Sequence, residues 1–296
     1  MYSFAGSFNV NMITDPLWQQ AMEKSALRNI EISTSQRPDD ELAKQVAADV
    51  LRLQKAGSVR AASLHLPFGA EINFSSDNEE MRRASVQGAI SYINIFRELD
   101  IHNITIHCSG ERDMNPDRKV HLQAMRRSCE EFLPLMQEMQ CSLNLEFLPR
   151  ICIGNTFEEL AEMTRDFPVE NIGICLDVNH GMNRGETIPA MIRACGDRLK
   201  TLHLSDYDNI DECHWNIGEG MLDWVEIQKS AAAMPQELLL IVETKVLAIA
   251  AWKGYTPDPR FEVQNVERNC MKFEFAAEQQ QLMEKIRAAG FTGGRC

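Results

Sequence analysis

Eight short apolar runs, each followed by a longer amphipathic stretch, constrain the fold of this chain more than any other feature. We expect strands at residues 3–10, 29–33, 61–68, 103–108, 142–147, 172–178, 199–205 and 238–244. Most of these runs are almost continuously apolar, which is typical of parallel strands that helices cover on both faces. The alternation predicts an α/β fold, a (β/α)8 TIM barrel that forms a single domain over residues 1–296. An open doubly wound sheet is the alternative, but no G-x-G-x-x-G turn follows the first strand.

Local signals place the ends of several helices. Asp15 is a typical N-cap residue, and Thr156 and Glu159 have the spacing of a capping box. The last long helical pattern covers residues 263–289. The segment before it, residues 251–262, is longer than a simple connection requires. We interpret that segment either as a lid or interface loop or as a passive surface loop.

The net charge of the chain limits its partners. The chain has 43 acidic and 30 basic residues, which give a formal net charge of −13. Such a chain repels a phosphate polyanion unless a local basic patch intervenes. The densest basic pairs are Arg82-Arg83, Arg118-Lys119 and Arg126-Arg127. We interpret these pairs as solvated helix faces, because none is interleaved with aromatic residues as in a nucleic-acid groove. We therefore expect no nucleic-acid partner.

The cysteine and hydropathy patterns bear on the compartment. The nine cysteines contain no C-x-x-C pair, which favours reduced thiols over a disulfide framework or a zinc ribbon. No apolar run approaches the ~18 residues of a membrane span. Residues 1–10 lack the basic and apolar regions of a signal peptide. We expect a cytoplasmic protein without a membrane partner, either a monomer or a homo-oligomer.

Carboxylate or imidazole side chains end seven consecutive strand patterns. They are Glu31, His65, His107, Glu146, Asp177, His203 and Glu243. The carboxyl ends of barrel strands surround the mouth at which active sites are built, so these side chains should converge. Any one of them alone could be a hydrogen-bonded core residue or half of an ion pair. Together, mixed carboxylate and imidazole donors suit Mn²⁺, Zn²⁺, Co²⁺ or Fe²⁺, and the oxygen donors leave Mg²⁺ open. The pattern predicts a divalent metal site.

The histidines concentrate in the same motifs. Those in or just beyond the strand ends are His65, His107, His180, His203 and His214. We expect the other two histidines, His102 and His121, to lie on the surface.

The motifs LEF, CLDVNHG, LHLSDYD with HWNIGEGMLDW, and IVET carry a resemblance that covers most of the chain. They resemble the xylose isomerase-like TIM barrels, a superfamily of sugar-phosphate isomerases and epimerases that also includes endonuclease IV. The resemblance implies that Glu146, Asp177, His203 and Glu243 hold one divalent metal ion (Mn, Zn, Co or Mg) and that His180 contacts the substrate. It also implies a small-molecule carbohydrate substrate, which the protein would isomerise or epimerise.

The catalytic residues that the resemblance implies are two of these ligands. Glu146 and Glu243 would remove a proton beside a carbonyl group and return it, through an enediolate. The alternative leaves both glutamates as metal ligands only and assigns the base to His180 or His107.

The substrate-binding residues are expected on the same rim. Donors to sugar hydroxyls would come from His65, His107, Arg150, His180 and His214. Arg150 could equally pair with an acidic residue at the barrel rim. The stretch LPRICIG lacks the further glutamate with which ketose 3-epimerases of this superfamily contact their substrate. This departure disfavours simple ketohexose 3-epimerisation and leaves open a free, oxidised or glycosylated sugar or a cyclitol.

Two other classes of function use the same residues. The endonuclease IV branch binds three zinc ions, and Glu212-x-His214 stands here where that branch has aspartate and histidine. A multinuclear zinc phosphoester hydrolase is therefore the main alternative, although the charge of −13 weighs against a DNA substrate. A non-catalytic sugar-binding barrel is the other, and a lyase with the same metal and base is a close variant of the isomerase. One ion per chain favours the isomerase, and three ions favour the hydrolase.

Overall fold

Parallel strands form the centre of the molecule. The computed structural model describes residues 1–69, 71–110, 117–182, 187–245 and 258–288, in which eight strands close into a barrel. The strands are β1 (Tyr2–Asn9), β2 (Asn29–Ser33), β3 (Arg60–His65), β4 (Asn103–Ile106), β5 (Ser142–Phe147), β6 (Ile172–Asp177), β7 (Leu199–Leu204) and β8 (Leu238–Val242). Each strand pairs with its neighbours in sequence, and β8 closes the ring against β1, with Leu238 opposite Tyr2. The predicted (β/α)8 barrel is confirmed.

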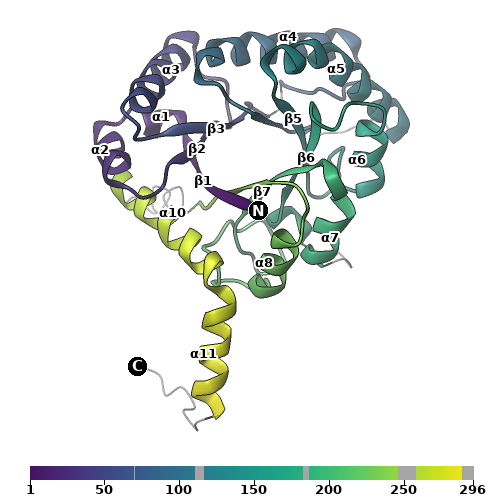
Figure 1. The fold of residues 1–296 in the computed structure, drawn as a ribbon. Helices are drawn as coiled ribbons and strands as arrows, with labels where there is room; N and C mark the ends of the chain where they lie inside the picture. Colours follow the sequence, from purple (N-terminus) through teal and green to yellow (C-terminus); the bar gives the residue numbers. More distant parts are fainter. Residues whose placement is uncertain (70, 111–116, 183–186, 246–257, 289–296) are drawn as a thin grey trace.

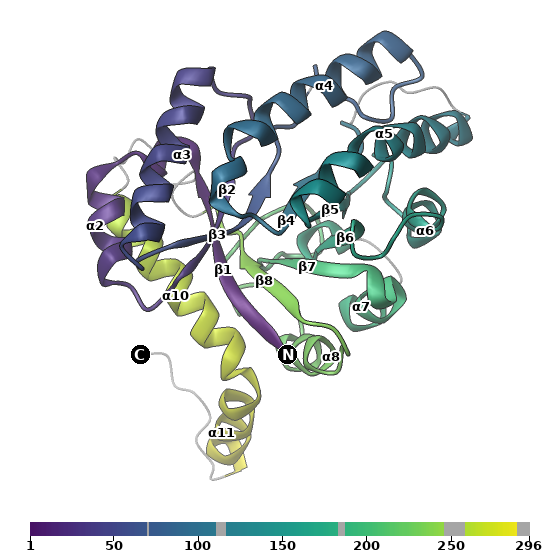
Figure 2. The ribbon, with the colours of Figure 1, turned by 45° about the horizontal axis from the view of Figure 1, so that its top comes forward.

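Helices surround the barrel, as Figures 1 and 2 show from two directions. They are α1 (Val10–Ile13), α2 (Pro16–Lys24), α3 (Asp40–Lys55), α4 (Glu79–Ile95), α5 (Arg118–Met139), α6 (Phe157–Thr164), α7 (Ile188–Cys195), α8 (Trp224–Ala232), α10 (Pro259–Glu274) and α11 (Ala276–Ala288). Single 3-10 turns are η1 (Arg97–Leu99), η2 (Asn179–Gly181) and η3 (Gly196–Arg198).

The predicted caps define two of these helices. The Asp15 carboxylate accepts a hydrogen bond from the backbone N–H of Leu17 at 2.7 Å, and α2 begins at Pro16. The Thr156 hydroxyl accepts from the N–H of Glu159 at 3.2 Å. The Glu159 carboxylate does not complete a capping box, because it binds Arg118 and the N–H of Gly154 instead. Glu159 therefore joins the first turn of α6 to Arg118 of α5 instead of completing the capping box.

Strand boundaries follow the apolar runs closely. β2 and β5 have the predicted limits, whereas β3 ends at His65 rather than at residue 68. Pro67 has no backbone N–H to donate to a neighbouring strand, so the ladder cannot continue through it. The shorter strand leaves His65 as the last residue of β3, at the mouth of the barrel.

Two apolar regions stabilise the barrel. The larger one fills the space between the strands and the helices, where Trp18, Phe132 and Phe147 are completely buried. A second, smaller cluster consists of Ala5, Ala62, Leu239 and Ile241. Alternate residues of a strand point the same way, so Leu239 and Ile241 share a face of β8 with Glu243. This small cluster therefore lies inside the barrel, beneath the polar side chains of the mouth.

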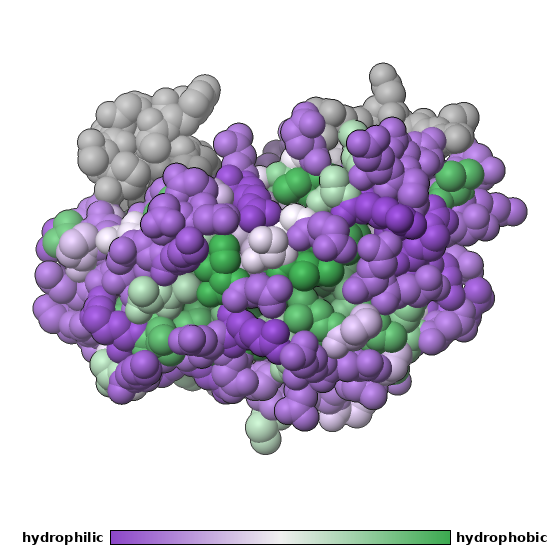
Figure 3. Space-filling model, turned by 90° about the horizontal axis from the view of Figure 1, so that it is seen from above, coloured by the Kyte–Doolittle hydropathy of each residue, from purple (hydrophilic) through white to green (hydrophobic). Residues whose placement is uncertain are grey.

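The outer face of the helices is mostly polar. Figure 3 views the molecule over α3, α4 and α5, which lie at the top of Figure 1, and hydrophilic residues cover most of this side. A patch of hydrophobic residues lies near the centre of the view.

The structure corrects two surface assignments. Arg82, interpreted as part of a solvated face, is 1% exposed and binds Glu79, Glu131 and the Ser128 hydroxyl. A charged side chain can be buried there because α5 supplies the second carboxylate and the hydroxyl. His121, expected on the surface, is 2% exposed, and its Nδ1 lies 2.7 Å from the carbonyl oxygen of Ser75.

The C-terminal helical pattern is divided. The predicted helix over residues 263–289 forms α10 and α11, with a break at Phe275, and α10 begins four residues earlier than expected. Residues 251–257 of the segment 251–262 lie outside the described residues. Asp258 caps α10, and the first turn of that helix follows. A lid or interface loop in this segment stays a prediction.

Two further expectations concern membranes and thiols. Among the described residues, no helix combines the length and the apolar character that a bilayer crossing requires. Eight cysteines lie in the described part of the chain, and none of them forms a disulfide there.

Candidate functional site

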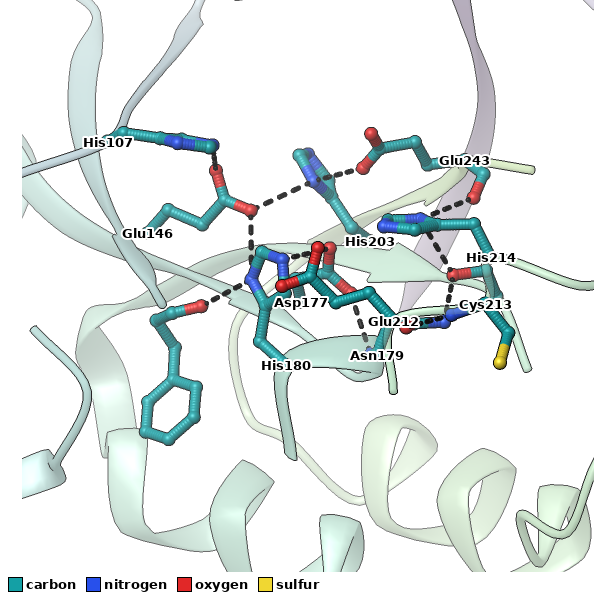
Figure 4. Close-up of polar contacts among 12 residues, drawn as sticks. His107, Glu146, Asp177, Asn179, His180, His203, Glu212, Cys213, His214 and Glu243 are labelled. Carbon is teal, nitrogen blue, oxygen red and sulfur yellow. Dashed lines mark hydrogen bonds and ion pairs between the residues drawn. The ribbon is translucent and has the colours of Figure 1, made fainter. Parts of the chain in front are cut away.

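Glu146, near the end of β5, is the centre of the polar cluster at the mouth. Its Oε2 atom lies 3.1 Å from Nε2 of His65 and 3.0 Å from Nε2 of His107. Its Oε1 atom lies 3.4 Å from Nδ1 of His180 and 3.7 Å from Nδ1 of His203. Figure 4 shows the Glu146 carboxylate between His107, His180 and His203. Four histidines, from β3, from β7 and from the loops after β4 and β6, thus converge on one buried carboxylate.

His203 in β7 lies between two further carboxylates. Its Nδ1 atom is 2.9 Å from Oε2 of Glu243, and its Nε2 atom is 3.4 Å from Oε2 of Glu31. The hydroxyl of Ser63 donates to the same Oε2 of Glu31 at 2.7 Å. Within the described residues neither ring nitrogen of His203 makes a hydrogen bond, although both lie close to carboxylate oxygens. Buried ring nitrogens normally have partners, so this arrangement suits a group bound between the side chains.

Asp177 ends β6 and has one free oxygen. The backbone N–H of Asn179 donates to Oδ1 of Asp177 at 2.7 Å. The other oxygen, Oδ2, has no hydrogen-bond partner among the described residues and lies 3.5 Å from Nε2 of His180. The His180 ring is oriented through Nδ1, which is 2.8 Å from the carbonyl oxygen of Phe147. The 3-10 turn η2 therefore places His180 against both Asp177 and Glu146.

The loop after β7 brings His214 to the rim. Asp206 and Trp215 form an isolated antiparallel bridge that folds this loop back on itself. His214 lies just before the bridge with a backbone φ of 46°, and its Nδ1 is 3.2 Å from the carbonyl oxygen of Glu243. Positive φ is uncommon for residues other than glycine and clusters at functional sites. The bridge and the contact with Glu243 hold His214 in this conformation.

Asp206 anchors the rest of that loop. Its Oδ2 atom accepts hydrogen bonds from the indole N–H of Trp224 at 2.8 Å and from the N–H of Gly218 at 2.9 Å. Its Oδ1 atom lies 2.3 Å from the place where a Cβ at Gly220 would be. Only glycine fits at position 220 without displacing this buried carboxylate. Gly218 and Gly220 therefore belong to a tight turn around Asp206.

Arg150 lies at the edge of the site. Its guanidinium binds Asp211 at 2.7 Å and Glu212 at 2.6 Å. Of the two predicted roles, the pairing with rim acids is the one present in the structure. Through these two ion pairs, the loop after β5 is joined to the loop after β7.

The pKa values of the central residues depend on their mutual contacts. Burial raises the pKa of the Glu146 carboxyl, but His107, His203 and His65 outweigh burial and hold that pKa well below its usual range. Burial alone would lower the pKa of His65, and contact with Glu146 raises it to about 9. Burial keeps the pKa of His107 lowered despite the same carboxylate. Protons on these rings and a cation would compete for Glu146.

The pKa values of His203 and Asp177 are shifted as well. Burial lowers the pKa of His203, but the neighbouring Cys175, Glu31 and Glu243 raise it well above its usual range. Burial raises the pKa of the Asp177 carboxyl. This ring of carboxylates therefore attracts positive charge, either on protonated imidazoles or on a bound cation.

Three overlapping groups of side chains could hold a cation. They are His65, His107 and Glu146; Glu146, Asp177 and His203; and Asp177, His180 and His214. In each group the candidate ligand atoms lie within 4.8 Å of one another. The middle group contains the free oxygen of Asp177 and the unpartnered nitrogens of His203. Oxygen and imidazole donors of this kind fit a divalent cation, and Glu243 adds a fourth donor next to His203.

Two polar residues of the site, Glu31 and Asn179, have roles that the sequence does not predict. Glu31 was noted as an acid at a strand end, but its contact with His203 was not. Asn179 joins the β6 and β7 loops, because its side-chain amide donates to Ser205 and its Oδ1 accepts from the N–H of Cys213. The only sequence signal for these roles was position, directly at or after a strand end.

Comparison with known proteins adds family relationships. The family model described as "Xylose isomerase-like TIM barrel" matches residues 20–259. D-psicose 3-epimerase of Enterocloster bolteae is 26% identical over 246 residues, which cover 77% of this chain and 78% of that protein. A probable endonuclease 4 of Sulfurihydrogenibium sp. is 25% identical over 187 residues, which cover 57% and 66%. An uncharacterized protein of Methanocaldococcus jannaschii is 24% identical over 62% of this chain and 64% of its own length. The chain thus spans just under two thirds of the last two relatives.

Solved structures share the fold. A D-tagatose 3-epimerase-like protein superposes with a TM-score of 0.71 and 17% identity over 93% of this chain and 99% of that one. The IOLI protein with a bound zinc atom gives a TM-score of 0.71 and 14% identity, with 92% and 98% covered.

Proposed function

Because this chain belongs to the xylose isomerase-like TIM barrel family, we propose that it is a divalent-metal-dependent isomerase or epimerase of a sugar or sugar derivative. The observation that carries the proposal is the convergence of Glu146, Asp177, His203 and Glu243 at the mouth of the barrel. The similarity to a D-psicose 3-epimerase supports a carbohydrate substrate.

The metal ligands are proposed to be these four side chains. Two of their atoms, Oδ2 of Asp177 and Nδ1 of His203, make no hydrogen bond in the described part of the chain, and Nδ1 lies 2.9 Å from Oε2 of Glu243. When bound, the ion would act as a Lewis acid that polarises a carbonyl oxygen of the substrate and favours loss of the neighbouring proton. Glu31 would hold the far side of the His203 ring and keep Nδ1 turned toward the ion.

Proton transfer is assigned to Glu146 and Glu243. The side chain of Glu243 is 24% exposed, which allows its carboxylate to approach a substrate carbon at the mouth. One carboxylate would take a proton from the carbon beside the carbonyl group, and the electron pair left behind would form an enediolate. The other would return a proton to the opposite face or to the adjacent carbon, so that no oxidant is required. The histidine contacts keep Glu146 in the ionised form that can accept a proton.

The substrate would lie against the histidines of the rim. His107 stacks on Phe68 with 4.1 Å between ring centroids, so its edge is presented to the mouth at a fixed angle. His180 and His214 face the same space from the opposite side, as Figure 4 shows. These rings can donate to or accept from sugar hydroxyls. Arg150 is occupied by two carboxylates, so its contribution would be to order the loops rather than to bind the substrate.

The decisive experiment combines metal analysis with isotope exchange. Protein purified without chelators is expected to carry one divalent ion per chain and to incorporate deuterium from solvent into a sugar of the right class. Glu146→Gln should abolish exchange, while Glu226→Gln, an exposed change on α8, should leave it intact. Full exchange by a metal-loaded Glu146→Gln protein would eliminate Glu146 as the base. A protein that never binds a divalent ion would overturn the proposal as a whole.

A second candidate, a multinuclear zinc phosphoester hydrolase, is favoured by one observation. The three overlapping ligand groups could accommodate more than one ion, and a probable endonuclease 4 is among the relatives. Three zinc ions per chain together with phosphodiester cleavage would support this alternative. One ion with sugar-dependent exchange would exclude it. The net charge of −13 weighs against a DNA substrate.

A further inference from the structure

The helix α11 projects from the barrel, and in the described part of the chain it packs mainly against α8 and α10. In Figure 1 it extends away from the other helices, at the lower edge of the molecule. Residues 278–288 are all exposed. Isolated helices shorter than about 12–15 residues are marginal in water, and most helices depend on packing of one face. A partner that covers the exposed face would therefore stabilise this helix of 13 residues.

The exposed apolar residues of this region form one stripe. At 100° per residue, Leu282 and Ile286 lie about 40° apart around α11. Phe275 directly precedes the helix, and its carbonyl oxygen accepts a hydrogen bond from the N–H of Gln279. Phe275, Leu282 and Ile286 are 47%, 57% and 36% exposed, respectively. Met283, 49% exposed, extends the stripe on one flank. Exposed apolar side chains that line up in this way mark an interaction surface.

A groove continues the stripe toward the body of the protein. It is lined by Ile217, Leu222 and Trp224 on one side and by Ala276 and Met283 of α11 on the other. A helix about 20 Å long and 10 Å wide covers less area than the roughly 1,200–2,000 Å² that a stable interface buries. A partner helix that lies on the stripe and also contacts this groove covers more of the required area.

The charges of α11 identify the partner as a second copy of the same helix. Glu278 and Lys285 lie on the same flank of the stripe, one in each half of the helix. When two copies pair antiparallel about a two-fold axis near residues 281 and 282, Glu278 of each lies opposite Lys285 of the other. In a parallel two-fold pair, the flank that carries these charges faces the opposite flank of the partner helix, so Glu278 and Lys285 cannot pair with each other. The helix is thus complementary to itself in one orientation only.

We propose that this protein forms a two-fold symmetric homodimer in which the α11 helices pack antiparallel along the stripe of Phe275, Leu282 and Ile286. The end of each α11 then lies beside the groove at the base of the other. The proposal is independent of the chemistry of the barrel mouth, because α11 contributes no residue to the candidate site.

The test is the oligomeric state of the full chain by sedimentation velocity and light scattering at micromolar concentrations. The wild type is expected to be a dimer, and Leu282→Glu/Ile286→Glu is expected to weaken the dimer by about tenfold or more. These residues are exposed, so the thermal midpoint of the barrel should stay unchanged. A monomeric wild type, or a double variant that dimerises as tightly as the wild type, would overturn the proposal.

Charge variants test the orientation. Lys285→Glu places two glutamates opposite each other and should weaken the dimer. The exchange Glu278→Lys/Lys285→Glu should restore it, because the pair is reversed but kept. Arg287→Glu makes the same change in charge two residues away, outside the stripe, and serves as the matched control. Equal effects of Lys285→Glu and Arg287→Glu, or no rescue by the exchange, would contradict the antiparallel arrangement.

Discussion

Raising the pH from 6.5 to 8.5 should destabilise the metal-free protein through the protonated histidines that surround Glu146. His65 has a pKa of about 9 in the folded state, against 6.5 for the ordinary side chain. A histidine whose folded pKa is raised stabilises the protein fully below its unfolded pKa, and the contribution disappears as the pH rises through the folded value. For His65 the contribution is about 3 kcal/mol at pH 6.5 and about 0.8 kcal/mol at pH 8.5.

The expected loss is therefore about 2 kcal/mol from His65 alone. His180 and His203 also have raised pKa values and change stability in the same direction. Thiols of the unfolded chain have a pKa of about 8.5 and are about half ionised at the upper end of this window, so the loss that belongs to His65 is the difference between the wild type and His65→Gln. Burial raises the pKa of folded Cys129 to about 12, so thiols would add a separate loss at higher pH.

The assay is urea unfolding of chelator-treated protein at pH 6.5, 7.5 and 8.5 at constant ionic strength. His65→Gln should reduce the loss, whereas His102→Gln, a change at an exposed histidine, should leave it unchanged. A saturating divalent ion should abolish the part of the loss that His65→Gln removes, because the ion takes the place of the protons. Unfolding free energies that stay constant or increase toward pH 8.5 in the chelated protein would refute this account of the site.

Three further predictions concern individual contacts. Glu31→Gln should weaken divalent-metal binding by about 10–100-fold without unfolding the protein; calorimetric titration measures this, and an unchanged affinity would remove Glu31 from the metal site. Arg82→Met should lower the free energy of unfolding by about 2–3 kcal/mol, because buried charged hydrogen bonds are lost. The neighbouring Arg83→Met should cost less than about 1 kcal/mol, and equal losses in urea titrations would show that burial of Arg82 is irrelevant. Asp206→Asn should cost about 2–3 kcal/mol and increase solvent quenching of Trp224 fluorescence, since the amide offers one acceptor oxygen instead of two; an unchanged emission spectrum and stability would argue against the loop anchor.

The fold could be predicted because its main signal is local. A run such as SLNLEF contains both the apolar residues of β5 and the glutamate at its end, so strand and site residue were found together. Pro67 shows the limit of apolar runs, because a missing N–H ends β3 before the run itself ends. The division between α10 and α11 was missed for a similar reason, since no proline or glycine marks the break at Phe275.

The errors concern contacts that join distant parts of the chain. Arg82 is buried because Glu131 and Ser128 approach it from α5, and periodicity within α4 contains no information on that approach. The partner of Arg150 was left open because the ion pairs with Asp211 and Glu212 depend on how two loops meet. Helix and strand patterns are encoded over a few residues, whereas these contacts require the assembled barrel.

The sides of His203 are occupied by residues from opposite ends of the chain, Glu31 from β2 and Glu243 just after β8. The four proposed ligands, by contrast, all come from β5 to β8, so one side of the barrel gathers them and closure of the barrel adds only the support of Glu31 behind the ring. A bound ion would therefore join the second four strands to one another. Removing it should increase amide exchange in β5 to β8 more than in β1 to β4.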